Sequence, residues 1–477
     1  MTDPQSGVPK RRTVAIVMAA GLGTRMKSAT PKVLHRICGR TIVEWVIEAA
    51  EQATGTRPLV VYSPATAAVR DAVAGLADTV LQDVPRGTGD AVRSALAALP
   101  GDVDEVLVLN GDVPLMRPEL LAALLEARRL DQAALALVAV DAIDPTGLGR
   151  VVRNEGGTVE RIVEDKDATN DERGISEINA GLYAVDAAWL RPRIADLQPS
   201  AVSGELYVTD LVAMARADGR LVAALDVEDD GRLTGINDRA QLAHAEWDMR
   251  VEINDRWMRA GVTMLDPSTA YIDHGVVLAE DVTLEPNVIL RGKTVVGRGS
   301  RIGAGSQIFD STVGEGCVVW ASIVERSTIE DAVTVGPMSH LRPGAHVGRR
   351  SEIGNFAEIK NSRLGEHVRQ HHNSYLGDAD VGAETNVGAG TITANYDGVR
   401  KHRTTIGEGV FLGVDTMLRA PVTLGDGAKT GAGAVVTHDV PAGKLAVGVP
   451  ARIREIRKPD DVARTGGDDA TRDGAAG

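Results

Sequence analysis

The sequence predicts an α/β domain with a mostly parallel sheet, then a long helix, then a left-handed parallel β-helix. Strand-like and helix-like segments alternate in the first half, which is typical of α/β folds. In the second half an aliphatic residue recurs at every sixth position. No α-helix or ordinary strand has that period, whereas hexapeptide-repeat β-helices do. The longest such run comprises Ile323, Ile329, Val335, Leu341, Val347, Ile353 and Ile359.

The chain length predicts more than one domain. At 477 residues the chain exceeds the size at which a single core stops growing. Aromatic residues make up only 3% of the chain, which suits the narrow interior of a β-helix. We expect disordered ends at 1–12 and 459–477, an α/β domain at 13–237, a linker helix at 238–261 and a β-helix domain at 262–458.

Charge and cysteine content exclude several classes of function. The net charge of −14 argues against general binding to nucleic acid or to anionic membranes. The two cysteines, Cys38 and Cys317, exclude a disulfide framework and indicate a reducing compartment. No apolar run approaches the roughly 18 residues of a membrane span. We therefore expect a soluble, cytoplasmic protein that binds neither nucleic acid nor membranes.

The elements of the first domain follow from short apolar runs and the segments between them. Strands are expected at 13–20, 59–62, 106–109 and 134–140, and helices at 41–53, 65–74, 89–99 and 118–128. Ligands of such folds bind at the carboxyl ends of the strands. The glycine-rich turn at 21–26 follows the first strand, so it lies at that edge.

This turn predicts a phosphate-binding site. It matches neither the dinucleotide fingerprint nor the phosphate-loop pattern. Backbone amides of residues 20–23 can nevertheless approach phosphate oxygens closely, because no bulky side chain intervenes. Arg25 and Lys32 supply the positive charge that phosphoryl transfer needs. A plain strand-to-helix connection is the alternative.

Asp112 ends the apolar strand at 106–109 and is a suitable oxygen ligand for Mg²⁺. The alternative is a turn cap, because Asn-Gly-Asp is strong turn chemistry. Asn237 could similarly be a helix N-cap, and Glu164 a residue of a solvated strand edge.

The segment 238–260 predicts an amphipathic helix that ends at Gly261. Its apolar residues recur at three-to-four spacing, namely Leu242, Ala245, Met249, Ile253 and Trp257. We expect this stripe to pack on one of the two domains.

The six-residue period also covers Val276, Val282 and Val288, and Ile406, Leu412, Leu418 and Leu424. It fails between 360 and 380 and between 391 and 405. Insertions in repeat folds form loops, often on the binding face. The first gap holds His371 and His372, and the second holds the basic run at 400–403. A histidine is well suited to accept a proton near neutral pH, although paired histidines are often only surface residues.

Motifs of the first domain resemble those of sugar-1-phosphate nucleotidylyltransferases. They are MAAGLGTRM, PKVLH, NGD, GLGR, IVEDKDA, EINAG and GINDR, in that order. The resemblance implies a Rossmann-like nucleotidyltransferase domain with Arg25 and Lys32 as catalytic cations, and with Mg²⁺ on Asp112 and Asn237. It also implies UTP and UDP-sugar contacts at Ala19, Ala20, Gly21, Gly23, Lys32, Gln82, Gly87, Thr88, Asn110, Gly111, Gly149, Glu164, Asn179 and Asn237. Among these, Gln82, Gly87 and Thr88 resemble the segment that binds the uracil, and Gly149, Glu164 and Asn179 resemble the sugar-binding segments.

The resemblance extends from about residue 13 to residue 458. LRPGAHVG, EIKNSRLG, HHNSYLGDA, TNVGAGTITANYDG and DTMLRAPVTLGDG are similar to segments of the bifunctional N-acetylglucosamine-1-phosphate uridylyltransferase / glucosamine-1-phosphate N-acetyltransferase family. This likeness implies His372 as the general base and a homotrimer with acetyl-transfer sites shared between β-helices. It implies glucosamine-1-phosphate contacts at Arg342, Lys360, Tyr375, Asn386 and Lys401, and acetyl-CoA contacts at Ala389, Asn395, Tyr396, Val414 and Ala432.

Three positions depart from that family's usual pattern. Val414 replaces a common serine, Arg419 a usual aliphatic residue, and Asn373 a commoner apolar residue. They leave open a single-activity nucleotidylyltransferase whose β-helix serves oligomerisation or regulation. A non-catalytic β-helix scaffold is a second alternative, which the joint presence of Arg25, Lys32 and Asp112 disfavours.

Overall fold

The computed structural model describes residues 11–455. The predicted disorder at 459–477, and at the N-terminus up to residue 10, lies outside the described residues. Arg12 is described, and its backbone N–H donates to Asp104 at 2.8 Å. The chain divides into two compact units, Met1–Met249 and Arg250–Gly477. Among the described residues, no helix combines the length and the apolarity that crossing a bilayer requires.

The first unit is built on a nine-stranded sheet with the main order β11-β7-β10-β6-β1-β4-β5. Neighbouring strands run parallel, except that β10 is antiparallel to both β6 and β7, and the β8–β9 hairpin adds to β10. The predicted mostly parallel α/β sheet is thus confirmed. The strands are β1 Thr13–Met18, β4 Leu59–Tyr62, β5 Asp78–Leu81, β6 Glu105–Asn110, β7 Leu135–Asp141, β8 Arg150–Arg153, β9 Val159–Val163, β10 Glu177–Asp186 and β11 Val222–Glu228, with a separate hairpin of β2 Arg36–Ile37 and β3 Arg40–Thr41.

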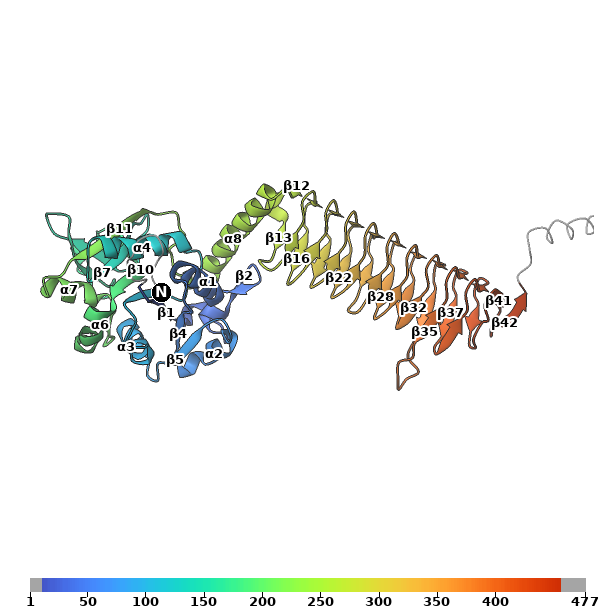
Figure 1. Cartoon of the computed structure of the whole chain (residues 1–477), viewed down its shortest axis with the longest axis horizontal. Helices are drawn as coiled ribbons and strands as arrows, with labels where there is room; N and C mark the ends of the chain where they lie inside the picture. The colour runs from blue at the N-terminus through green and yellow to red at the C-terminus, as the bar shows by residue number, and fades with distance from the viewer. Residues whose placement is uncertain (1–10, 456–477) are drawn as a thin grey trace, which may run out of the picture. The chain divides into compact units, whose positions relative to one another are not determined.

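Helices cover both faces of this sheet (Figure 1). Alternate residues of β1 point to opposite faces, so Val14 and Ile16 join one core while Ala15 and Val17 join the other. The helices are α1 Ile42–Thr54, α2 Ala68–Ala72, α3 Thr88–Ala98, α4 Pro118–Leu130, α5 Asn170–Arg173, α6 Ala187–Arg193 and α7 Asp210–Ala217, with short 3-10 turns at Thr24–Met26, Lys32–Leu34, Pro64–Thr66 and Ile194–Asp196. The predicted helix at 65–74 is therefore broken into a 3-10 turn and the short α2.

Helix α8, Arg239–Arg259, begins in the first unit and ends in the second. Its Glu246 accepts a hydrogen bond from the backbone of Cys38 at 2.8 Å. In the second unit, Asn254 donates to the carbonyls of Pro267 and Ala270 at 2.8 and 3.0 Å. The expectation that the helix packs on one domain was wrong, because each half of α8 contacts the unit to which it belongs.

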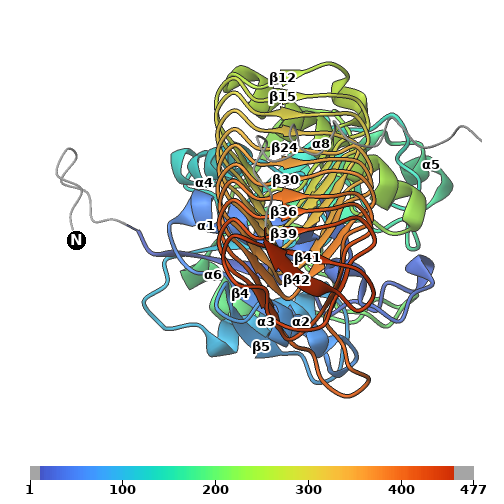
Figure 2. The same ribbon diagram turned by 90° about the vertical axis from the view of Figure 1, so that its right-hand side faces the viewer.

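The second unit is a parallel β-helix with three sheets of 12, 10 and 9 strands (Figures 1 and 2). The 12-stranded sheet comprises β12 Thr263–Met264, β15 Thr283–Leu284, β18 Arg301–Ile302, β21 Val318–Val319, β24 Thr334–Val335, β27 Glu352–Ile353, β30 Arg369–Gln370, β33 Asn386–Val387, β36 Phe411–Leu412, β39 Lys429–Thr430, β41 Lys444–Val447 and the antiparallel β42 Arg452–Glu455.

The other two sheets follow the same stacking. The 10-stranded sheet comprises β13 Tyr271–Ile272, β16 Ile289–Arg291, β19 Gln307–Phe309, β22 Ile323–Glu325, β25 His340–Leu341, β28 Glu358–Lys360, β31 Tyr375–Gly377, β34 Ile392–Ala394, β37 Met417–Arg419 and β40 Val435–Val436. The 9-stranded sheet comprises β14 Val277–Leu278, β17 Val295–Val296, β20 Thr312–Val313, β23 Thr328–Ile329, β26 His346–Val347, β29 Arg363–Leu364, β32 Ala379–Val381, β35 Thr404–Ile406 and β38 Val422–Leu424.

The predicted inward-facing aliphatic residues are buried, with one exception. Ile323 is 37% exposed, and the buried residue of β22 is its neighbour Val324. Val324 follows the inward Val319 one position sooner than a six-residue step would place it. The next inward residue, Ile329, again follows after five residues, so a strict six-residue step back from Ile329 points to Ile323, which faces outward.

The gap expected at 360–380 does not exist. Strands β29, β30 and β31 continue the three ladders in register. The six-residue period fails there because Leu364 and Val381 each come one position early, and because the inward residue of β30 is Gln370. No loop leaves the β-helix at this point.

The second predicted interruption is real. Between β34 and β35 a loop at residues 395–403 extends from the coils (Figure 1). Across this turn the backbone N–H of Val410 donates to the hydroxyl of Thr385 over 25 residues, whereas 17 residues separate Val368 and Ser351 in the equivalent contact. The extra residues of this coil form the loop that contains the basic residues 400–403.

Candidate functional sites

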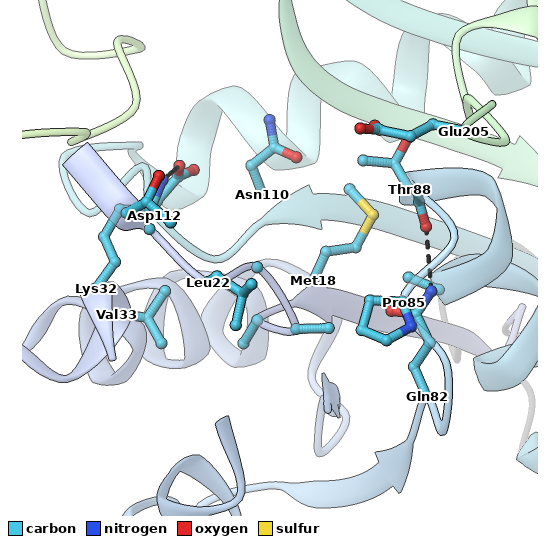
Figure 3. Close-up of a pocket in the computed structure, with 17 residues that line it drawn as sticks. Met18, Leu22, Lys32, Val33, Gln82, Pro85, Thr88, Asn110, Asp112 and Glu205 are labelled. Carbon is cyan, nitrogen blue, oxygen red and sulfur yellow. Dashed lines mark hydrogen bonds and ion pairs between the residues drawn. The ribbon is translucent and has the colours of Figure 1, made fainter. Parts of the chain in front are cut away.

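The first unit has a cavity of about 510 Å³ at the carboxyl ends of its parallel strands. Strands β1 and β6 are neighbours, with Met18 opposite Asn110, so the glycine-rich turn and the Asn-Gly-Asp turn meet at one edge. Figure 3 shows Lys32 and Asp112 at one end of the cavity, and Gln82, Pro85 and Thr88 at the other. The lining comprises Met18, Ala19, Ala20, Gly21, Leu22, Gly23, Thr24, Lys32, Val33, Gln82, Pro85, Gly87, Thr88, Ala91, Asn110, Asp112 and Glu205.

At one end of this cavity, two oxygen atoms converge on the Lys32 ammonium. Lys32 Nζ lies 2.5 Å from Asp112 Oδ2 and 3.1 Å from Asn237 Oδ1. The backbone brings these distant residues together, because the N–H of Ile236 donates to the carbonyl of Asp112 at 2.9 Å. Both predicted metal ligands therefore meet beside the predicted phosphate-binding lysine.

The glycine-rich turn needs glycine at position 23. Gly23 has φ of +58°, and a Cβ atom there would overlap the Lys32 side chain. Its absence lets Lys32 lie against the turn. Arg25 occupies the same turn, but its side chain is exposed and is not part of the cavity wall.

The other end of the cavity holds the residues predicted to bind the base. Gln82 is buried, and its Nε2 donates to Asp90 Oδ2 at 2.8 Å and to the carbonyl of Gly87 at 3.2 Å. Thr88 begins α3, and its hydroxyl accepts a hydrogen bond from the N–H of Val208 at 3.0 Å. These bonds fix the backbone that forms this end of the cavity.

The predicted sugar-binding residues Gly149, Glu164 and Asn179 lie together. The N–H of Asn179 donates to the carbonyl of Gly149 at 2.9 Å, and a Cβ on Gly149 would lie 3.6 Å from Glu164 Oε2. Burial raises the pKa of Glu164, and the carboxylates of nearby acidic residues add to that shift. The Thr209 hydroxyl donates to Glu164 Oε1 at 3.0 Å. This hydrogen bond lowers the pKa of Glu164 and so acts against the effect of burial.

Three residues around these sites were missed from the sequence. Glu205 lines the cavity, Thr209 holds Glu164, and Gly235 lies against the Asp112 carboxylate. Glu205 and Thr209 belong to the segment GELYVTD, which begins α7. The acidic and hydroxyl residues of this segment carry no spacing signal, so only the fold reveals their roles.

On the β-helix, three predicted phosphate-binding cations gather where the 10-stranded sheet turns into the 9-stranded sheet, which we call the second corner. A contact with Lys401 and the charges of Lys401 and Arg342 lower the pKa of Lys360. Arg342 Nη1 also lies 2.7 Å from Glu358. The loop at 395–403 thus brings Lys401 back to the wall, beside Lys360.

Tyr375 reaches the same corner because residue 377 has no side chain. A Cβ atom on Gly377 would overlap the Tyr375 hydroxyl and ring. Gly377 pairs with Lys360 across the ladder. Tyr375 therefore directs its hydroxyl towards the cationic cluster. Asn386 lies instead on the 12-stranded sheet, paired with Arg369 and Phe411, and is not part of this cluster.

The loop is held at its base and within itself. Asn395 is nearly buried and donates to Asp378 Oδ2 at 2.5 Å. Asp397 accepts hydrogen bonds from the N–H groups of Val399 and Arg400, both at 2.7 Å. Tyr396 and Lys401 form an antiparallel bridge across the loop.

The predicted base and three of the predicted coenzyme residues lie on a different edge, the first corner, where the 12-stranded sheet turns into the 10-stranded sheet, whereas the other two, Asn395 and Tyr396, lie in the loop at 395–403. Gly390 N–H donates to the carbonyl of His372 at 3.3 Å, and Asp415 N–H to that of Ala389 at 2.7 Å. Gly433 N–H donates to Val414 at 2.8 Å. His372, Ala389, Val414 and the neighbour of Gly433, Ala432, therefore stack coil upon coil. His372 is exposed, and its ring meets that of His371 edge-on.

Two family models match the chain. Residues 15–172 match the MobA-like NTP transferase domain, and residues 403–438 match the bacterial transferase hexapeptide. The chain thus combines a nucleotidyltransferase domain with a hexapeptide-repeat β-helix, as its motifs predict.

Curated relatives extend this likeness over nearly the whole chain. A bifunctional protein GlmU of Pelobacter propionicus is 44% identical over 91% of this chain and 95% of its own length. Those of Mycolicibacterium vanbaalenii and Trichormus variabilis are 42% and 43% identical over 92% and 94% of this chain, and over 90% and 98% of their own lengths. A solved putative glucose-1-phosphate thymidylyltransferase of Bacillus anthracis covers 49% of this chain and 94% of its own, at 18% identity and a TM-score of 0.41, which is too low to support an argument.

The chain belongs to the family of bifunctional GlmU proteins. The predicted family, the fold class and the prediction of a bifunctional transferase are confirmed at this level. The roles of individual residues stay predictions.

Proposed function

We infer that this protein is a bifunctional enzyme of UDP-N-acetylglucosamine synthesis. Its β-helix, residues 262–458, acetylates glucosamine-1-phosphate with acetyl-CoA. Its first domain, residues 13–237, transfers UMP from UTP to the resulting N-acetylglucosamine-1-phosphate and releases pyrophosphate. One observation carries this proposal: the motif residues, scattered in the sequence, gather at the ends of the parallel strands in one unit and at two corners of the β-helix in the other.

In the first domain, a phosphate oxygen of the sugar phosphate attacks the α-phosphorus of UTP, and pyrophosphate leaves. Lys32 and Arg25 supply positive charge, and the backbone N–H groups of residues 20–23 face the triphosphate. Gln82 and Thr88 hold the uracil at the far end of the cavity, while Glu164 and Asn179 bind the sugar.

Asp112 and Asn237 fit a magnesium ion. Both offer oxygen atoms, which Mg²⁺ prefers, and both already converge on one cation. Within residues 11–455 no group of three or more His, Cys, Asp or Glu is placed to hold a metal. Two protein oxygens suit Mg²⁺, which keeps several water or phosphate ligands. When bound, it would neutralise charge on the triphosphate.

In the β-helix, the amine of glucosamine-1-phosphate attacks the thioester carbonyl of acetyl-CoA, and the thiol of coenzyme A leaves. Arg342, Lys360 and Lys401 bind the phosphate, and Tyr375 contacts the sugar. His372 accepts the proton that the amine loses. Acetyl-CoA lies along the stacked corner of Ala389, Val414 and Ala432, and Asn395 and Tyr396 contact it from the loop.

We further propose a homotrimer and a cytoplasmic location. The cationic cluster and His372 lie on different corners of one β-helix, so a neighbouring copy would complete each acetyl-transfer site. The buried thiols of Cys38 and Cys317 suit a reducing compartment. The product would serve as a precursor of cell-wall polymers.

One pair of variants tests both assignments. We expect His372→Ala to lower acetyl transfer about 10²- to 10⁴-fold and to leave uridylyl transfer nearly unchanged, because only one step loses its base. Asp112→Ala should do the reverse. The assay supplies glucosamine-1-phosphate, acetyl-CoA, UTP and Mg²⁺ and identifies the products by mass.

The matched control is His371→Ala, which removes the neighbouring imidazole and should spare most of the acetyl transfer. If His372→Ala kept full acetyl transfer, the base assignment would be wrong. A wild-type chain that transfers uridylyl but never acetyl groups would instead support the single-activity alternative.

A further inference from the structure

A glutamine interrupts the aliphatic interior of the β-helix directly beside His372. Strands β15 to β36 of the 12-stranded sheet place a fully buried side chain inward at each coil. Gln370 on β30 is 0% exposed. The corresponding residues of the other strands are Leu284, Ile302, Val319, Val335, Ile353, Val387 and Leu412.

The Gln370 amide has no evident value for stability. Its Nε2 donates to Ser374 Oγ at 3.1 Å, whereas its Oε1 has no hydrogen-bond partner within the part of the chain that the structure describes. A buried polar atom without a partner costs free energy, and an aliphatic side chain of similar volume would avoid that cost.

The hydrogen bond spans a strained piece of backbone. Gln370 and Ser374 flank residues 371–373, and within that turn His372 and Asn373 have φ of +58° and +44°. Two successive non-glycine residues in the left-handed region are unfavourable and persist only when the surroundings hold them. The equivalent turn one coil earlier contains a single such residue, Phe356.

The other restraints on this turn are backbone hydrogen bonds and a contact at its outer side, where His371 Nε2 lies 3.2 Å from Glu352 Oε2. Asn373 N–H donates to the carbonyl of Asn355 at 2.9 Å, and the carbonyl of His372 accepts from Gly390 at 3.3 Å. The bond from Gln370 to Ser374 is the side-chain restraint on the inner side of the turn. This bond joins the residue before the turn, Gln370, to the residue after it, Ser374.

We propose that Gln370 is a positioning residue for His372, and that its hydrogen bond to Ser374 fixes the turn that presents the imidazole to the substrate amine. The inference rests on the proposed role of His372 as the general base. It assigns to the buried amide a function in acetyl transfer that compensates for its unfavourable burial.

The test is Gln370→Leu, which keeps the volume and removes the amide. We expect kcat for acetyl transfer to fall about tenfold, because a base displaced by a fraction of an ångström loses its alignment. The KM values for glucosamine-1-phosphate and acetyl-CoA should stay within twofold, and Tm should stay equal or rise. If Gln370 served stability alone, Gln370→Leu would instead lower Tm and leave kcat unchanged.

Ser374 supplies an independent pair of variants. Ser374→Ala removes the partner of the amide and should lower kcat to the same extent, while Ser374→Thr keeps a hydroxyl and should retain most of it. The double variant Gln370→Leu/Ser374→Ala should be no worse than either single one, because all three break one bond. If Gln370→Leu fails to fold, the comparison of Ser374→Ala with Ser374→Thr tests the proposal by itself.

Ile353→Leu is the matched control, since Ile353 has the same inward position one coil earlier. Its kcat and the uridylyl transfer of every variant should stay unchanged. Full kcat in both Gln370→Leu and Ser374→Ala would overturn the inference, as would a loss of kcat that merely follows a lower Tm. The proposed base itself is judged separately, by His372→Ala.

Discussion

At the scale of single residues, the cationic cluster of the β-helix places three positive charges close together. Lys360, Lys401 and Arg342 repel one another, and this repulsion is what lowers the pKa of Lys360. A dianionic phosphate group would relieve the repulsion. The cluster is therefore better suited to bind a phosphate than to stabilise the fold.

This repulsion predicts a dependence on pH. Because its pKa is lowered, Lys360 loses its proton at a lower pH than an ordinary lysine, and the neutral amine binds phosphate less well. We expect KM for glucosamine-1-phosphate to rise as the pH increases from about 7 towards about 10. In Lys401→Gln, KM should be higher throughout, but its rise should move to a higher pH, because the charge that lowers the pKa of Lys360 is gone.

Steady-state kinetics across that pH range would measure the effect, with KM for acetyl-CoA as the internal control. A pH profile that is identical in the wild type and in Lys401→Gln would contradict the inferred coupling between the two lysines.

At the scale of elements, the loop at 395–403 decides whether the cluster is complete. Lys401 belongs to this loop, and Asp397 organises it by accepting two backbone N–H groups and by pairing with His402 at 2.6 Å. These bonds also lower the pKa of Asp397, so the carboxylate stays charged well below neutral pH.

We expect Asp397→Ala to loosen the loop and to raise KM for glucosamine-1-phosphate about two- to tenfold, with little change in uridylyl transfer. Hydrogen exchange of the loop amides, measured beside the kinetics, would connect the two effects. Asp439→Ala is the matched control, because Asp439 also accepts a backbone N–H, from Thr423, at another turn of the β-helix. If Asp397→Ala showed faster exchange but an unchanged KM, the order of the loop would not control substrate binding, and this prediction would be wrong.

At the scale of the whole molecule, two compact units with separate sites should respond separately to ligands. We expect UTP with Mg²⁺ to raise the unfolding temperature of the first unit, and acetyl-CoA to raise that of the second. A ligand at 100 times its Kd stabilises the unit that binds it by about 2.7 kcal/mol.

Differential scanning calorimetry of the full chain would resolve these shifts. Asp112→Ala should abolish the effect of UTP with Mg²⁺ and keep that of acetyl-CoA. A single transition that both ligands raise equally would show that the units unfold as one.

Much of the fold was predictable because it depends on local patterns. The strand at Leu59–Tyr62 and the start of α4 at Pro118 follow from apolar runs and a proline signal. Two of the exceptions share a cause: the exposed Ile323 and, in part, the supposed gap at 360–380 come from steps that are one residue short. A fixed six-residue period misses such steps, whereas the hydrogen-bonded ladders of the β-helix stay in register across them.

The sequence by itself determined the two-part architecture, the glycine-rich turn and the family, because these depend on periodicity and on residues close together in the chain. Only the tertiary structure decided that Asn237 meets Asp112 at Lys32 and that Thr209 holds Glu164. Such contacts join residues through sheet pairing and coil stacking. They depend on which backbone groups become neighbours after folding, and no local pattern encodes that.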